Sequence, residues 1–193
     1  MAFLKKKTDR RQRLETIWFR MPFADLARKL HDLPAEPKFL KLLLSSSLAS
    51  SNTLAVGLGL YDEREDNPFF NNIGYKEAHA LQKWIMIYQM LGFIINGECD
   101  SYGVTAKTLT ETFFWLWDFD EDDKKLFERL YKMVGDDDID DIHYEYAKTM
   151  IKEILGPDKA TDNAASALAT SLFQSYGALS RDLENKMEKR ELF

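Results

Sequence analysis

The sequence predicts an all-α fold, a single-domain helical bundle of about seven helices with a long loop at residues 61–75. The chain of 193 residues has the length of one domain and carries only five prolines and nine glycines, so few residues break helices. Apolar residues recur at spacings of three and four, and no stretch alternates between apolar and polar residues as a half-buried strand does. Ordinary proportions of hydrophobic (45%) and charged (30%) residues exclude a collagenous, a largely disordered and a polytopic membrane chain.

The first predicted helix covers residues 9–33 and follows a basic, flexible tail at residues 1–8. Pro22 should kink or restart this helix, because proline has no amide hydrogen to donate. Residues 1–20 hold seven lysines and arginines against two acidic residues, a charge that nucleic acid or an anionic membrane would attract. No recognition motif joins these basic residues, so we expect a solvated terminus and regard nucleic acid as an unlikely partner.

The second predicted helix, at about residues 38–60, is apolar on every side and should be covered by other helices. Small side chains recur every fourth residue and form a ridge for close helix packing: Ser47, Ser51, Ala55 and Gly59. The stretch from Leu42 to Tyr61 is long enough to span a bilayer, but seven of its twenty residues are Ser, Thr or Asn. Lipid would not compensate these polar groups, so the sequence favours a buried soluble helix and no stable membrane insertion.

Residues 61–75 have no sustained apolar period and are rich in Asn, Asp, Pro and Gly, which predicts a long loop. Phe69 and Phe70 are the unusual residues in it. We expect them to anchor the loop on the core. The alternative is that they form an exposed contact for a partner.

The helix predicted at residues 76–96 has a broad apolar face and a more polar opposite side. His79 lies on the polar side, which predicts a surface histidine. Met86 and Met90 lie on the same side, where they are candidates for a stripe that binds a partner.

Four further helices are predicted at about residues 105–117, 120–134, 138–155 and 161–190. The last one carries Leu179, Leu183 and Met187 as a narrow apolar stripe among charged residues. Residues 178–193 are therefore predicted to form an amphipathic helix that protrudes from the domain and seeks a partner.

An acidic patch at residues 118–141 holds eleven acidic residues against four basic ones. Asp136, Asp138 and Asp140 are candidate ligands for a divalent cation, because carboxylate oxygens bind Mg²⁺ and Ca²⁺. Neither acidic run has the glycine and glutamate that a calcium loop of the EF-hand type requires. Helix capping is the favoured interpretation, with Asp120 and Asp138 at the N-terminal ends of two helices.

His143 lies within the apolar face of its predicted helix, where its imidazole needs a hydrogen-bond partner. Residues 113–119 hold five aromatic side chains, too many for one face of a helix. These features make five residues candidates for a pocket that binds a flat or lipidic ligand: Phe114, Trp115, Trp117, His143 and Tyr146. The favoured interpretation is core packing for the aromatic rings and a backbone carbonyl or tyrosine hydroxyl as the partner of His143.

The sequence carries no signature of a catalytic or cofactor site, and its single cysteine and lack of a signal peptide predict a cytoplasmic protein. The favoured hypothesis is a non-enzymatic interaction or scaffold protein without a cofactor, which forms a homo-oligomer or binds another protein. The candidate interface residues are Phe69, Phe70, Met86, Met90, Leu179, Leu183 and Met187. The alternative is a helical bundle that binds a small apolar ligand or a metal ion near the aromatic residues. An enzyme that uses Asp140, His143 and Tyr146 is a third hypothesis.

Overall fold

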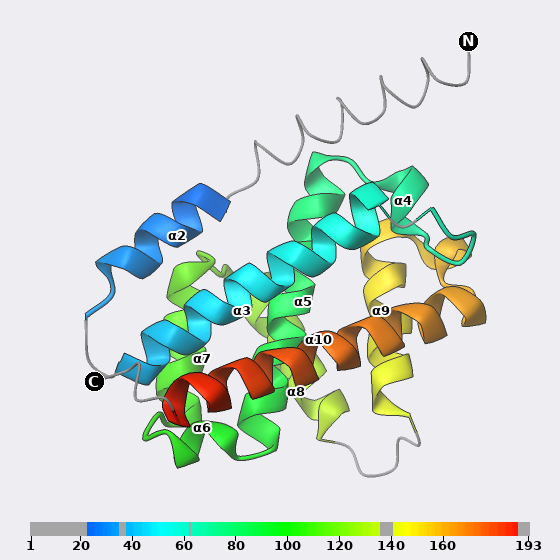
Figure 1. Ribbon diagram of the computed structural model, residues 1–193. Coiled ribbons are helices and arrows are strands. Elements are labelled where there is room, and N and C mark those ends of the chain that lie inside the picture. The colour runs from blue at the N-terminus through cyan, green and yellow to red at the C-terminus, as the bar shows by residue number, and fades with distance from the viewer. Residues whose placement is uncertain (1–22, 35–37, 62, 136–140, 189–193) are drawn as a thin grey trace.

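A computed structural model describes residues 23–34, 38–61, 63–135 and 141–188 (Figure 1). Predictions about residues 1–22, among them the basic tail and the effect of Pro22, lie outside the described residues. The described chain is all α-helical and has no strand, which confirms the predicted fold class. Its elements are α2 (Phe23–Asp32), α3 (Lys38–Val56), which continues as a π-helical turn (Gly57–Tyr61), α4 (Phe69–Asn72), α5 (Tyr75–Ile95), α6 (Glu98–Ser101), α7 (Ala106–Leu116), α8 (Glu121–Val134), α9 (Ile142–Leu155), a 3₁₀ turn (Pro157–Lys159) and α10 (Asp162–Glu188).

The helices are arranged around α5, which lies behind α3 and α10 in Figure 1. Helices α3 and α10 run in opposite directions along one face, since Ser46 bonds to Lys186 near one end and Ser50 to Ser175 farther along. Helix α9 packs on α10, α5 and α8. The central helix is therefore enclosed from several directions.

Because other helices enclose α5, the prediction that its more polar side faces solvent is wrong for the residues named here. Met86 and Met90 are fully buried, so neither forms a stripe that a partner can reach. His79 is half-buried and meets the Trp117 ring edge-on, with 5.4 Å between the ring centroids. The prediction of a surface position was wrong because it assumed a helix covered on one side only, whereas helices pack on α5 all round.

Helix ends follow the local sequence closely. The Asp120 carboxylate caps α8 by accepting hydrogen bonds from the amides of Asp122 and Asp123, at 3.0 and 2.8 Å. Helix α9 begins later than the predicted residue 138, because Asp141 is its N-cap and accepts from the amide of Tyr144. Asp138 lies outside the described residues.

The described part of residues 61–75 is mostly non-helical, as predicted, but includes the short helix α4. Phe69 is completely buried in the core, and its amide donates to the side chain of Asn67. The Asn67 amide group in turn donates to the carbonyl of Leu58. Phe69 therefore anchors the segment and is not an exposed contact, whereas Phe70 is half-buried.

The C-terminal half of α10 lies on the bundle and does not protrude. Leu179 and Leu183 are buried, and Met187 packs against the core. Lys186 donates to the Ser46 hydroxyl of α3. The stripe that predicted a free helix is instead the contact face of α10, at least as far as Glu188, where the described residues end.

Helix α3 contributes its ridge of small residues to the interior, because Ser47, Ser51 and Ala55 are all fully buried. Phe39–Gly59 is the one segment in the described ranges that is long and apolar enough to cross a membrane, and 44% of its most apolar window is buried within the protein. A core helix of a soluble protein has the same properties, so this segment is weak support for a membrane span. The opposite side of α3 exposes Ser45, Ala49 and Thr53.

Candidate functional site

A pocket of about 370 Å³ opens where four helices meet, and we call it the Tyr88 pocket. Its volume lies in the range of about 300–1,000 Å³ that small-molecule sites occupy. The lining residues come from α5 and its C-cap, the end of α8, the start of α9 and the middle of α10: Tyr88, Gly92, Ile95, Asn96, Val134, Ile142, His143, Phe173 and Tyr176. Of the residues predicted from the sequence, His143 lines this pocket.

His143 is held by Tyr88, whose hydroxyl lies 2.8 Å from Nδ1 of the imidazole. Burial raises the pKa of the Tyr88 hydroxyl, and the negative charge of Asp141 raises it further. Tyr88 therefore stays protonated at neutral pH. Among the described residues Nε2 of His143 has no hydrogen-bond partner, so this nitrogen is available to a ligand. A neutral imidazole offers one donor and one acceptor, and the bond to Tyr88 uses only one of them.

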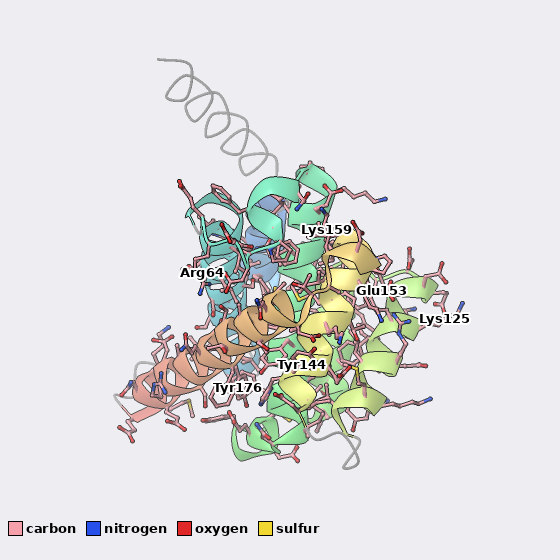
Figure 2. The ribbon with its side chains drawn as sticks, turned by 90° about the vertical axis from the view of Figure 1, so that its right-hand side faces the viewer. Arg64, Lys125, Tyr144, Glu153, Lys159 and Tyr176 are labelled. Carbon is pink, nitrogen blue, oxygen red and sulfur yellow. The ribbon has the colours of Figure 1, made fainter. Side chains whose placement is uncertain are left out.

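Tyr176 forms the opposite wall. Its hydroxyl donates to the Glu98 carboxylate at 2.6 Å and accepts from the amide group of Asn96 at 3.0 Å. Burial raises the pKa of the Tyr176 hydroxyl, and its hydrogen bond to Glu98 adds to the effect. In Figure 2, Tyr176 is labelled on α10, which runs obliquely beside α9.

Gly92 permits this position of the Tyr176 ring. A Cβ atom at residue 92 would lie 2.5 Å from the nearest ring carbon, far inside van der Waals contact. The glycine therefore lets an aromatic ring from α10 rest directly on the backbone of α5. A larger residue at this position would force the Tyr176 ring out of its place.

The rings of the pocket meet at steep angles. Tyr88 and Tyr176 are almost perpendicular, at 87° with centroids 6.4 Å apart, and His143 and Phe173 are tilted by 51° with centroids 5.1 Å apart. Phe173 is 56% exposed and Ile95 is 39% exposed, both unusual for large apolar side chains. Together they form an apolar rim at the mouth of the pocket.

Tyr146 lies behind the pocket and not in its wall. Its hydroxyl is buried and donates to the carbonyl of Trp84 at 2.8 Å, and its ring meets that of Tyr88 at 5.1 Å. The Tyr146 side chain thus supports Tyr88 from the core. Asp140, the third member of the enzyme hypothesis, lies outside the described residues.

The structure separates the three aromatic residues that were predicted to join His143. Trp115 is 48% exposed beside Lys29, whose ammonium lies 5.7 Å from the ring centroid. Trp117 is buried, and its Nε1 donates to the sulfur of Met86. Phe114 lines a different cavity of about 440 Å³ between α7 and α8. The prediction of one shared pocket was wrong because successive residues near the end of α7 point in different directions.

The metal hypothesis receives no structural support within the described ranges. No group of three or more His, Cys, Asp or Glu side chains there could hold a metal ion. The candidate ligands Asp136, Asp138 and Asp140 lie in the segment 136–140, outside the described residues.

Sequence reasoning missed most of the pocket, namely Tyr88, Gly92, Asn96, Phe173 and Tyr176. One signal was available: Phe173 and Tyr176 are large aromatic residues three apart in a helix segment that is rich in Ala and Ser. A single glycine inside the apolar helix α5 was a second signal, because glycine inside a helix often marks a close approach.

A wider, open groove of about 740 Å³ lies between α3 and α10. Small and hydroxyl-bearing side chains line most of it, among them Ser50, Thr53, Ser171 and Ser175.

Comparison of the chain with protein-family models, curated proteins and solved structures gave no significant match.

Proposed function

We propose that this protein binds a small organic ligand in the Tyr88 pocket. The observation that carries the proposal is the combination of Nε2 of His143, which has no hydrogen-bond partner among the described residues, with an exposed apolar rim at Phe173 and Ile95. Small-molecule sites combine apolar walls with a few convergent polar groups in this way. The volume of about 370 Å³ admits a ligand of modest size.

The burial of the candidate interface residues favours ligand binding over self-association. Phe69, Met86, Met90, Leu179 and Leu183 are each less than 4% exposed, so they offer no surface to a second chain. A partner could reach these side chains only if the bundle opened. The large apolar side chains that are exposed include two at the mouth of the Tyr88 pocket, where a ligand would cover them.

Native mass spectrometry of the freshly purified full chain, followed by a thermal-shift screen of small organic compounds, tests the proposal. We expect a co-purified mass or a stabilising compound, and we expect Phe173→Ala to abolish the signal. Tyr75→Ala is the matched control, because Tyr75 is 47% exposed and lies outside the pocket lining. A clean apo mass with no stabilising compound, or equal effects of the two substitutions, would contradict the proposal.

A further inference from the structure

We infer that the ligand of the Tyr88 pocket is an organic cation, such as a small quaternary ammonium compound, held against aromatic ring faces. The inference rests on the proposed function and names the chemical class of its ligand. Three features of the pocket carry it: the arrangement of its rings, the charges of the side chains around it, and the helix ends that meet there.

The aromatic rings that line the pocket lie at an angle to one another and are not stacked. Tyr88 stands almost perpendicular to Tyr176, and the imidazole of His143 is inclined to both Tyr88 and Phe173, at 64° and 51°. These rings are inclined to one another and not stacked, and Phe173 is 56% exposed, so the surface of the Phe173 ring is open to a ligand at the pocket. Cations bind over aromatic faces within about 6 Å of the ring centroid, and cages of several rings recognise quaternary ammonium groups.

The charged side chains around the pocket favour a positive ligand. No lysine or arginine is among the residues that line it. A carboxylate lies beside it instead, because Glu98 accepts a hydrogen bond from the hydroxyl of Tyr176, which lines the pocket. An anionic ligand would meet this negative charge with no lysine or arginine in the lining to offset it.

The helix ends favour a cation as well. Ile95 is the last residue of α5 and Val134 the last of α8, so the C-terminal ends of two helices reach the pocket. Helix C-termini carry a partial negative charge of about half an electron. The positive end of α9 also lies here, but the Asp141 carboxylate occupies and neutralises it.

Isothermal titration of the full chain with choline and with its uncharged isostere 3,3-dimethylbutan-1-ol tests the inference. The two probes have the same shape, and only choline carries a charge. We expect choline to bind about threefold to thirtyfold more tightly, the range that a cation over aromatic rings provides. Phe173→Leu keeps an apolar side chain but removes a ring, so it should reduce this ratio, while Tyr75→Leu should not change it.

The outcomes separate the inference from the proposed function. Equal binding of both probes, or tighter binding of the alcohol, would overturn the cationic ligand and leave a pocket for neutral molecules. No choline binding at millimolar concentration would also overturn it, and the compound screen above would then decide whether the pocket binds any ligand. Retention of helical circular dichroism in Phe173→Leu ensures that a lost preference does not reflect unfolding.

Discussion

Tyr88 and Gln89 are neighbours on α5, yet they belong to two regions of opposite character. Tyr88 faces the pocket, where the Nε2 nitrogen of His143 has no partner among the described residues. Gln89 faces the seam between α3 and α10, which we call the Gln89 seam and which consists of Gln89, Ser47, Ser50 and Ser175.

Every polar group of the Gln89 side chain has a partner. Its oxygen accepts from the Ser47 hydroxyl at 2.6 Å, and its nitrogen donates to Ser50 and Ser175, both at 3.0 Å. A buried amide with every polar atom paired holds helices in one arrangement, and the Gln89 side chain has no polar atom left for a ligand. The Tyr88 pocket has such an atom. Polar residues on one side of α5 therefore serve stability in the seam with α3 and α10, and those on another side serve recognition, by our proposal.

Gln89→Leu should produce the largest loss of stability, about 3 kcal/mol in the free energy of unfolding. The substitution leaves the completely buried Ser47 hydroxyl without its acceptor and removes two further hydrogen bonds, and each orphaned buried group costs about 1–3 kcal/mol. Urea denaturation measures the change. If the seam is structural only, binding at the Tyr88 pocket should remain within about twofold of wild type.

Gln82 provides a matched control for this prediction. It lies seven residues earlier on the same helix and is completely buried, but neither polar atom of its amide has a partner among the described residues. Gln82→Leu should therefore stabilise the protein by about 1 kcal/mol, because an unpaired buried amide is replaced by an apolar group. The same loss of stability in both variants would show that hydrogen bonding does not distinguish the two glutamines.

Gly92→Ala tests the tight wall of the Tyr88 pocket and should cost about 2 kcal/mol, the usual size of an overpacking effect. The added methyl group would overlap the Tyr176 ring. In a Tyr176→Ala background the same substitution should instead stabilise by up to about 1 kcal/mol, because alanine is the better helix former. Equal effects in the two backgrounds would contradict the role of the ring.

Gly177→Ala is the control for this experiment. A Cβ atom there would meet only the end of the Arg181 side chain, at an ordinary 3.6 Å. Thermal or urea denaturation of both glycine variants should therefore give changes of opposite sign. A destabilised Gly177→Ala would mean that the cost at residue 92 reflects something other than the Tyr176 ring.

The sequence predicted the features that depend on neighbouring residues along the chain, such as helix bounds. It did not predict burial or the pocket, because these depend on contacts between segments that are distant in the sequence. The helix predicted at 76–96 is observed at Tyr75–Ile95, because periodicity and the Gly97 stop, which has a φ of +68°, are local signals. The exposure of Met86 was predicted wrongly because no local pattern reveals how many helices surround α5. The Tyr88 pocket draws on four helices, so only the tertiary arrangement brings Phe173 to His143.

The last predicted effect is a difference in alkaline stability between the two regions. The pKa of Tyr88 is raised in the folded state, chiefly by burial, whereas the unfolded chain loses this proton near pH 10. Below about pH 10 the contribution of Tyr88 to stability is fully present. As the pH rises further, the unfolded state ionises first, and stability falls by up to about 1.4 kcal/mol per pH unit for this one proton.

Tyr88→Phe should therefore lose stability less steeply than wild type between about pH 10 and pH 11, measured by urea denaturation at each pH. Gln89→Leu alters a seam built only of glutamine and serine, none of which titrates, so its stability should be lower throughout but decline with the wild-type slope. The lysines contribute equally in all three proteins and cancel, whereas Tyr146 and Tyr176 interact electrostatically with Tyr88, so the change in slope reports Tyr88 together with these two neighbours. Parallel curves for Tyr88→Phe and wild type would mean that the hydroxyl of Tyr88 ionises in the folded protein as it does in water, and the pocket would then be more solvated than its burial indicates.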